Sequence, residues 1–408
     1  MTNIFITEIE VKEHPFLKPI HVKMKNTKNL KPIIITGRNG TGKTTLLTGL
    51  HKFTLSLVNN PTQLEDTKKA IKSFQDSIVL PSHAGDEHKN TRLSWERAIV
   101  QQEGFLLNTF GYVNATLNLD IPDDLLNNKY IIGLLETRRK TQLTNVTAIS
   151  KPKINQTRSG SYSEQFLQYL VNIKSQQAFA IADGQNEEAK KITQWFHTLE
   201  KLFSDLFETP ITLTFDRTNL TFKIFGNDKE LEFNNLSDGY SSAINIISEV
   251  ILRMEEHKFG DYTQSGIIFI DEIETHLHVS LQRNILTMLR AFFPNIQFIV
   301  TTHSPFVISS VDDAFVIDME SGEGFEQDDG FWKYSYEALV EGFFETEKFS
   351  VILESKIEEY ERLSSYEPEN LSKEERKALR KLAKELENVP LYKNESIEMK
   401  LKQLGLRK

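Results

Sequence analysis

The segment from Gly37 to Thr44 has the residue types and spacing that hold phosphate groups. It reads Gly-Arg-Asn-Gly-Thr-Gly-Lys-Thr, lies after an apolar run and precedes a helical pattern, as a phosphate-binding loop does. Glycines let the backbone N–H groups point at phosphates, and the following helix adds the positive end of its dipole. Lys43 would neutralise the β- and γ-phosphates, and the Thr44 hydroxyl would ligate magnesium. We therefore predict an ATP site rather than a simple glycine-rich turn, with the binding residues Arg38, Asn39, Gly40, Thr41, Gly42, Lys43, Thr44 and Thr45.

A second chemical pattern is the apolar run Ile267–Ile270 followed by two acids, Asp271 and Glu272. A buried strand of this kind delivers carboxylates to the carboxyl edge of a sheet, where open α/β sheets bind ligands. We predict that Asp271 holds the magnesium ion and that Glu272 polarises the attacking water as a catalytic residue. The alternative is a strand that merely ends in solvated acids.

Two further motifs give this order of residues a family resemblance. Leu236-Ser237-Asp238-Gly239-Tyr240 precedes Asp271, and Thr301-Thr302-His303-Ser304 closes the following strand. This order resembles ABC-type ATPases over most of residues 1–318. Transporters carry Leu-Ser-Gly-Gly-Gln, so the departures at positions 238 and 240 favour SMC-like and RecF-like heads.

The resemblance implies roles for three of these residues. Ser237 and Gly239 would contact the γ-phosphate held by a second protomer, at the start of a helix whose dipole favours an anion. This implies a homodimer or a higher oligomer. His303 matches the switch histidine of the family and would be catalytic, hydrogen-bonded to the γ-phosphate or the attacking water. Taken alone, a histidine at a strand end is more often only structural.

The run from Asp271 to His278, Asp-Glu-Ile-Glu-Thr-His-Leu-His, narrows the resemblance. It is similar to AAA-family, ABC/SMC-type ATPases of bacterial phage defence, of the Septu, retron and overcoming-lysogenisation types. Glu274, His276 and His278 suggest a second metal site. Hydrogen bonding at an interface is the favoured interpretation.

The elements that must position these motifs are typical of an α/β fold. Short apolar runs alternate with helical patterns, as in a largely parallel sheet. We predict a P-loop NTPase with an ABC/SMC-type head over residues 1–330, with a mixed sheet core and a helical insertion at about 160–207. Residues 331–408 are predicted to form a C-terminal helical extension in which Ser372 and Glu375 cap a helix. Residues 59–111 show no clear pattern, and no heptad run is long enough for an SMC-style arm.

A basic segment between Thr137 and Ser163 is exceptional in an acidic chain. It contains six basic residues and no acid, whereas the whole chain has a formal charge of -9. Arg138, Arg139 and Lys140 are the candidate contacts to nucleic-acid phosphates. Two alternatives are a solvated loop without a partner and an arginine that reaches the nucleotide.

Composition excludes several classes. The chain has 408 residues and no cysteine, so disulfides, thiolate nucleophiles and cysteine-based zinc sites are absent. No apolar run approaches the ~18 residues of a membrane span, and we expect a cytoplasmic protein without membrane contact.

The resemblance implies a regulatory ATPase of an anti-phage defence complex, with ATP and Mg²⁺ as cofactors and an HNH-type nuclease as partner. A RecF-like ATPase of DNA repair or recombination is the alternative. A transporter ATPase is disfavoured by the altered signature. A self-contained nuclease is disfavoured because no Asp-x-Asp pair follows His303.

Overall fold

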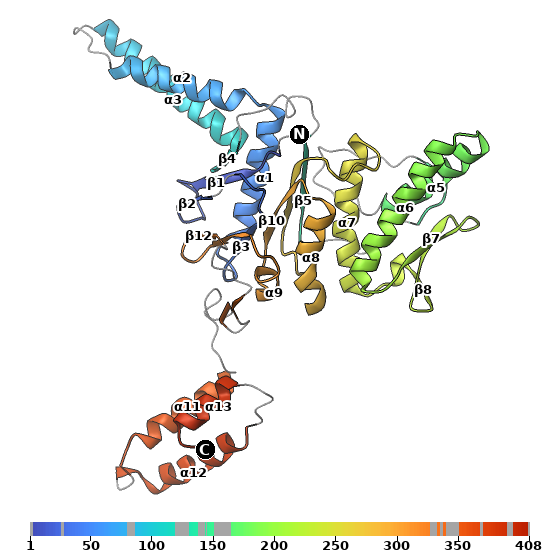
Figure 1. The fold of residues 1–408 in the computed structure, drawn as a ribbon. Coiled ribbons are helices and arrows are strands. Elements are labelled where there is room, and N and C mark those ends of the chain that lie inside the picture. The colour runs from blue at the N-terminus through green and yellow to red at the C-terminus, as the bar shows by residue number, and fades with distance from the viewer. Residues whose placement is uncertain are drawn as a thin grey trace. The chain divides into compact units, whose positions relative to one another are not determined.

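The computed structural model divides the chain into two compact units, Met1–Tyr334 and Ser335–Lys408, which are described separately (Figure 1). The residues that the structure describes are 3–25, 28–79, 86–118, 130–137, 143, 145–150, 165–326, 333–334, 338–339, 351–367, 370–389 and 395–406.

A six-stranded sheet with the order β12-β11-β3-β10-β9-β5 forms the centre of the larger unit. Five of its strands are parallel and β12 is antiparallel, so the predicted mixed sheet is confirmed. Strands β3, β9 and β10 are buried along their whole length, because both faces of the sheet are covered. The strands are β3 (Ile33–Thr36), β5 (Ile131–Leu135), β9 (Gly266–Ile270), β10 (Ile296–Thr301), β11 (Phe315–Asp318) and β12 (Glu323–Glu326).

Helices lie on both sides of this sheet, with α1 on one side and α7 and α8 on the other (Figure 1). Helix α1 also contacts β4 of a second, antiparallel sheet with the order β2-β1-β4. Apolar residues of both sheets and of α1 form one core cluster, which fixes the loop between β3 and α1. These elements are β1 (Ile6–Val11), β2 (Ile20–Lys23), β4 (Val113–Leu117), α1 (Lys43–Asn59), α7 (Asp238–His257), α8 (Val279–Phe292) and α9 (Pro305–Ile308).

The predicted helical insertion consists of two antiparallel helices, α5 (Phe166–Ala182) and α6 (Asn186–Phe207). The chain turns between them at Asp183 and Gly184, and Gly184 has a positive φ of 72°. A three-stranded antiparallel sheet follows, formed by β6 (Thr212–Asp216), β7 (Thr221–Gly226) and β8 (Lys229–Glu232). A short 3-10 helix, η2 (Phe233–Asn235), leads to α7.

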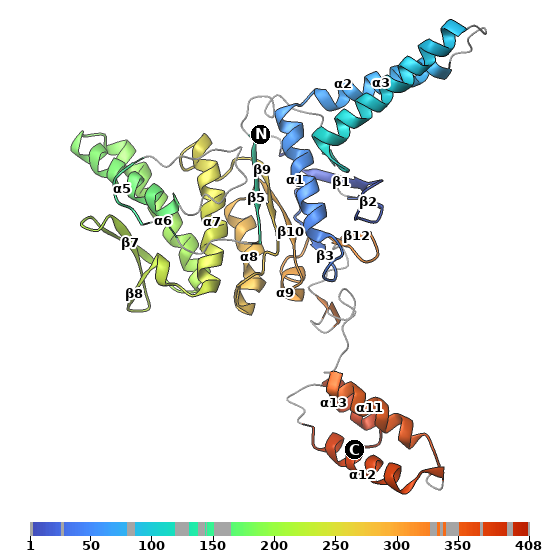
Figure 2. The ribbon, with the colours of Figure 1, turned by 180° about the vertical axis from the view of Figure 1, so that it is seen from behind.

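A helical hairpin of α2 (Gln63–Val79) and α3 (Asp86–Phe110) extends from the sheet region in both ribbon views (Figures 1 and 2). The sequence analysis did not identify it. The apolar residues of α3 are spread around the helix, and Leu93, Val100 and Leu107 are exposed, so no amphipathic period marks the element.

The smaller unit contains α11 (Val351–Ser364), α12 (Lys373–Glu387) and α13 (Glu395–Gln403). Its apolar clusters include Ile357, Leu386 and Leu401. The predicted cap of α12 is confirmed, because Glu375 N donates to Ser372 Oγ over 3.1 Å and Ser372 N donates to Glu375 Oε2 over 2.8 Å. Within the described part of the chain, no helix is long and apolar enough to cross a membrane.

Candidate nucleotide site

The phosphate-binding loop connects β3 to α1. Gly37, Gly40 and Gly42 have φ angles of 135°, 84° and 93°, values that residues with a Cβ rarely adopt. The Lys43 ammonium crosses the loop, donating to Gly37 O over 2.9 Å and to Arg38 O over 2.8 Å. The loop therefore holds Lys43 at the start of α1.

A second loop, residues 12–19 between β1 and β2, packs against the phosphate loop. A Cβ at Gly42 would overlap Leu17 Cδ2, so glycine is required there for space as well as for its φ angle. Lys18 Nζ donates to Glu320 O over 3.2 Å, and Arg38 N donates to Glu320 Oε1 over 3.3 Å.

The same loop presents an aromatic ring that the sequence analysis missed. Phe16 is 86% exposed, although the residue after it is packed on Gly42. His14 Nδ1 fixes the turn by accepting from Phe16 N over 3.0 Å and from Leu17 N over 3.2 Å. No sequence signal identifies Phe16, because its exposure depends on how the loop packs on the phosphate loop.

Asp271, at the end of β9, is hydrogen-bonded to the last residue of the phosphate loop. Thr44 Oγ1 lies 3.0 Å from both Asp271 oxygens. Thr301 Oγ1 donates to Oδ1 over 2.7 Å, and Thr137 Oγ1 donates to Oδ2 over 2.7 Å. The structure thus brings together the two predicted magnesium ligands, one from α1 and one from β9.

The hydroxyl and carboxylate oxygens at this point fit Mg²⁺. Neighbouring ligands of an octahedral Mg²⁺ at about 2.0–2.1 Å lie about 2.9 Å apart, close to the 3.0 Å between Thr44 and Asp271. A hard cation also prefers an all-oxygen set of ligands over nitrogen or sulfur.

Glu272 follows Asp271 with a left-handed φ of 44°, a strained conformation for a residue with a long side chain. Two interactions support it. Glu272 N donates to Thr301 Oγ1 over 2.7 Å, and Thr275 Oγ1 donates to Glu272 Oε2 over 3.2 Å.

Acidic side chains lie near the Lys43 ammonium group. Burial lowers the pKa of Lys43, and the nearby charges of Glu272, Glu274 and Asp271 act in the opposite direction.

Glu274 holds the segment that carries His303. Its Oε2 accepts from Thr302 Oγ1 over 2.7 Å, and its Oε1 accepts from His303 N over 2.6 Å. Burial, followed by the charge of Lys43, lowers the pKa of His303. The imidazole is therefore neutral near pH 7.

The structure gives two members of the Glu274–His278 run hydrogen-bonding roles inside the chain. Glu274 has the contacts above, and the ring of His278 caps α8 by accepting from Ser280 N. His276 has a left-handed φ of 67°. Among the described residues, no group of three or more His, Asp or Glu side chains is arranged to hold a metal ion.

The signature residues lie at the start of α7, where Ser237 is the N-cap residue and its side chain makes no capping hydrogen bond. Ser237 is exposed. A Cβ at Gly239 would lie 3.1 Å from His276 O, so this glycine lets α7 approach its own 276–278 segment. Tyr240 stacks on Phe207 of α6 at 4.3 Å between ring centroids. No hydrogen bond within the described residues joins Ser237 or Gly239 to the phosphate loop of the same chain.

The candidate nucleic-acid contacts Arg138, Arg139 and Lys140 lie outside the described residues.

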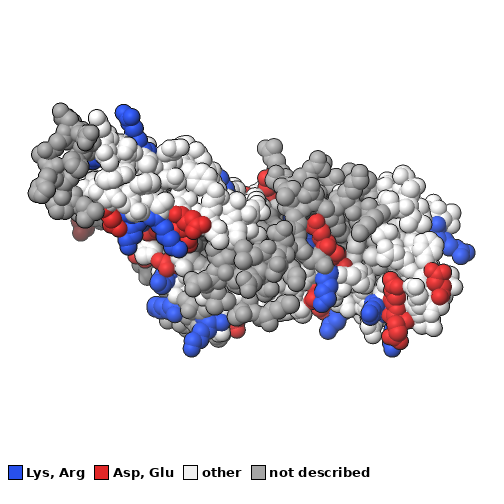
Figure 3. Space-filling model, turned by 90° about the horizontal axis from the view of Figure 1, so that it is seen from above, with Lys and Arg blue, Asp and Glu red and all other residues white. Residues whose placement is uncertain are grey.

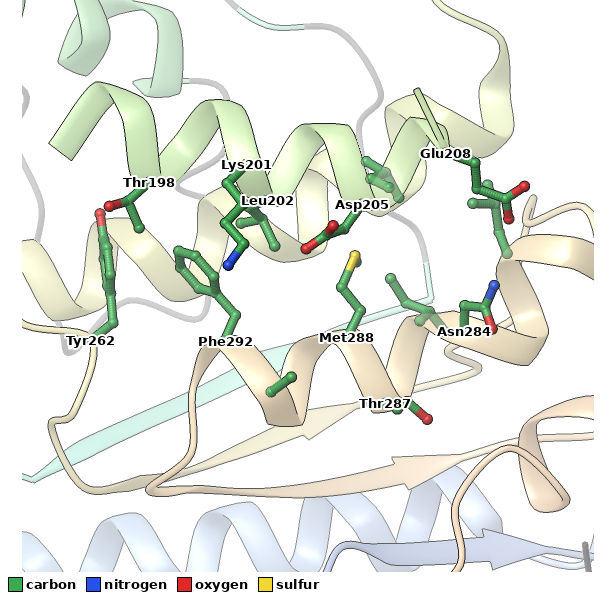
Figure 4. Close-up of a pocket in the computed structure, with 14 residues that line it drawn as sticks. Thr198, Lys201, Leu202, Asp205, Glu208, Tyr262, Asn284, Thr287, Met288 and Phe292 are labelled. Atoms are coloured by element: carbon green, nitrogen blue, oxygen red, sulfur yellow. The ribbon is translucent and has the colours of Figure 1, made fainter. Parts of the chain in front are cut away.

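A separate cavity of about 570 Å³ lies between α6 and α8 (Figure 4). Leu202 and Met288 form part of its apolar lining, and Lys201, Asp205 and Asn284 are among its polar residues. None of the predicted ATP-site residues lines it, so the motifs and not the cavity define the nucleotide site.

Comparison with protein families gives a match to the model described as "AAA domain, putative AbiEii toxin, Type IV TA system" over residues 122–309. This range covers less than half of the chain. It includes Ser237, Asp271, Glu272 and His303, and it begins after the phosphate loop. The matched segment therefore resembles an AAA domain, and together with the phosphate loop it supports ATPase activity.

Several curated relatives are named as retron probable ATPases or as Septu proteins. The chain is 31% identical over 152 residues to the retron Ec83 probable ATPase of Escherichia coli, a match covering 36% of this chain and 28% of that protein. It is 24% identical over 316 residues to the Septu protein PtuA of Bacillus mycoides, covering 76% and 40% of the two chains. For PtuA of Bacillus thuringiensis the identity is 25% over 292 residues, covering 68% and 67%. The predicted resemblance of the ATPase domain is confirmed.

Solved structures with similar folds include an SMC head bound to the C-winged helix domain of ScpA, with 11% identity and a TM-score of 0.37. That alignment covers 79% of this chain and 96% of the other. A nucleotide-free ATP-binding cassette of an ABC transporter gives 15% identity and a TM-score of 0.35, covering 80% and 90%. These overlaps are too weak to carry an argument. The sheet order and the placement of the motifs support the ABC/SMC-type head.

Proposed function

We propose that the chain binds and hydrolyses Mg-ATP between two copies of itself, and that this cycle controls a partner nuclease in anti-phage defence. One observation carries the ATPase part of the proposal. Lys43, Thr44 and Asp271, which come from distant parts of the sequence, converge where β3 and β9 end. Open α/β sheets bind ligands at this edge.

The chain's own residues would divide the work of binding. Lys43 would contact the β- and γ-phosphates together with the N–H groups of the loop. The ring of Phe16, exposed beside this loop, would stack on the adenine base. Thr44 and Asp271 would hold Mg²⁺, which when bound neutralises the developing charge on the phosphates.

Hydrolysis would depend on Glu272 and His303. Glu272 would accept a proton from the attacking water. His303, neutral because burial lowers its pKa, would hydrogen-bond the γ-phosphate or that water from a backbone position fixed by Glu274. Ser237, exposed and without a hydrogen bond to its own phosphate loop, would reach the γ-phosphate bound by the second protomer.

The defence role rests on the similarity to the retron and Septu proteins. We propose that the chain acts in the cytoplasm with a nuclease of the HNH type.

The defence role is tested by expressing the chain together with an HNH-type nuclease, if a neighbouring open reading frame encodes one, and measuring phage plaque formation. We expect the wild-type pair to reduce plaques, and the pair with Lys43→Ala to lose this protection because the ATP cycle is blocked. Lys69→Ala, at an exposed position of α2, is the control and should protect as well as the wild type. If the wild-type pair gives no phage protection but restores survival after DNA damage, the RecF-like alternative is correct.

A further inference from the structure

Basic side chains gather on one face of α12 in the smaller unit. Positions 373, 376, 377, 380, 381 and 384 recur at intervals of three and four residues, so a period of 3.6 places them within an arc of roughly 140°. All of them are exposed. We call this surface the α12 basic face, formed by Lys373, Arg376, Lys377, Arg380, Lys381 and Lys384.

This segregation differs from the surface of the larger unit. Figure 3 shows Lys and Arg interspersed with Asp and Glu over the described residues of that unit's face. The whole chain is acidic, with a formal charge of -9. Solvation alone does not require the cations of a helix to lie on one side. Their segregation on α12 therefore indicates an anionic partner.

Four acids lie on α12, and one of them, Glu387, falls within the arc of the basic face at the C-terminal end of the helix, where the six cations outnumber it. Glu375 belongs to the helix cap. Glu385 pairs with Lys356 of α11 over 2.8 Å and lies 3.8 Å from Lys381. The other five cations of the basic face form no ion pair with another described residue.

The opposite side of α12 is occupied by the core of its own unit. Leu386 is 0% exposed and Leu382 is 8% exposed, and both contribute to the apolar clusters that join α12 to α11. An amphipathic helix that binds a membrane must insert its apolar face into lipid. Because this apolar face is already buried, the geometry favours a polyanion that contacts the charged groups alone.

A pocket of about 380 Å³ adjoins one edge of the basic face, where Arg376, Arg380 and Tyr366 contribute to its lining. Ser364 and Ser365 also line it, but their hydroxyls donate to the carbonyls of Glu361 and Arg362 in their own turn. Glu367 is the acid at this pocket. Two guanidinium groups and a phenol are the donor types that proteins use for phosphate oxygens.

We propose that the α12 basic face binds the phosphodiester backbone of a nucleic acid. Each helical turn of about 5.4 Å presents one or two cations, so the face can follow successive phosphates along a strand. Contacts of this kind are salt-sensitive and largely independent of base sequence. The surface lies outside the nucleotide site, and the proposal does not depend on ATP hydrolysis.

The test compares the wild-type full-length chain with Lys377→Glu/Arg380→Glu/Lys384→Glu. Fluorescence anisotropy would use labelled single-stranded RNA, single-stranded DNA and duplex DNA of one sequence over a series of salt concentrations. We expect at least one of these probes to bind the wild type, with binding by the variant at least about tenfold weaker and its salt slope reduced by about three, roughly one per lost phosphate contact. Arg376 is left intact because its Nε donates to Leu371 O over 3.0 Å.

Controls separate this site from general charge effects and from the ATPase. Lys69→Glu/Lys72→Glu/Lys190→Glu makes the same change of net charge at exposed positions of α2 and α6, and it should bind like the wild type. Lys43→Ala should bind the nucleic-acid probes like the wild type, because Lys43 is not part of the α12 basic face. This expectation holds whether or not the chain hydrolyses ATP. Circular dichroism must show the α12 variant folded. A milder variant, Lys377→Gln/Arg380→Gln/Lys384→Gln, replaces it if the triple glutamate chain unfolds.

Three results would overturn the proposal. In the first, the wild type binds none of the probes in a salt-dependent manner. In the second, the α12 variant and the α2/α6 variant lose equal affinity, which would reveal only a net-charge effect. In the third, the wild type binds anionic lipid vesicles through α12 and ignores nucleic acid.

Discussion

Replacing Lys43 with alanine is expected to weaken ATP binding by more than a hundredfold. The ammonium group is buried, held by Gly37 O and Arg38 O at the start of α1, and we propose it as the charge that contacts the β- and γ-phosphates. A lost charge-assisted contact of about 3 kcal/mol corresponds to a factor of roughly 150 in Kd. Isothermal titration calorimetry with ATP and Mg²⁺ measures the change directly.

Phe16→Ala provides a graded comparison. Its exposed ring is proposed to contact the base and not the phosphates, so its loss should raise the Kd by about two- to twelvefold, because a stacking contact is worth about 0.5–1.5 kcal/mol. Thermal unfolding must show that both variants remain folded, since Lys43 also ties the loop together. If Lys43→Ala binds ATP as tightly as the wild type, the phosphate loop is not the nucleotide site.

Glu272→Gln is expected to bind ATP normally but to hydrolyse it at least about a hundredfold more slowly. Glutamine keeps the size of the side chain and accepts the same hydrogen bond from Thr275, but it cannot take a proton from water. Positioned general bases contribute typically 10²–10⁴-fold to a rate. Release of inorganic phosphate under saturating ATP and Mg²⁺ measures kcat, and calorimetry shows that binding is retained.

Glu320→Gln is the matched control for the loss of a carboxylate near Lys43. Glu320 also lies beside the phosphate loop, where it accepts from Arg38 N over 3.3 Å, but it is not part of the β9 edge. Its replacement should change kcat far less than that of Glu272. Equal losses of kcat in the two variants would show that kcat depends on the total negative charge near Lys43 and not on Glu272 in particular.

Much of the ATPase head could be predicted from the sequence because its motifs and its strands reinforce each other. The apolar runs that became β3, β9 and β10 are buried on both faces, and such runs are legible without an alternating pattern. Each ends in a motif, so the convergence of Thr44, Asp271 and the Thr301–Ser304 segment at one sheet edge could be anticipated from strand direction. The roles of these residues in catalysis remain predictions.

Other features could not be predicted because they depend on contacts between distant segments. Glu274 was considered as a metal ligand, and only the fold shows that it accepts from Thr302 and His303. Phe16 is one of many phenylalanines in the sequence. Its exposure could not be predicted from the sequence, because it depends on the packing of Leu17 against Gly42.

Helices α2 and α3 were not predicted from the spacing of apolar residues in the sequence. Helix α3 carries no continuous apolar stripe of the kind that identifies a buried helix face. Helix α2 does carry one, formed by Leu64, Ile71, Phe74 and Ile78, but it was not recognised in the sequence. The α12 basic face could not be predicted for a different reason. Its charges are visible in the sequence, but their segregation from the buried Leu382 and Leu386 required the helix to be placed in its unit.

The shared site is the central claim, and a mixture of two inactive variants tests it most directly. Lys43→Ala removes the phosphate-binding charge, and Ser237→Arg blocks the exposed start of α7, so each protein alone should hydrolyse no ATP. In a mixed dimer, one intact phosphate loop faces one intact signature, and we predict that phosphate release recovers when the two are combined. If the mixture stays as inactive as its components while the wild type is active under the same conditions, the site is built within one protomer or across a different interface, and the account is contradicted.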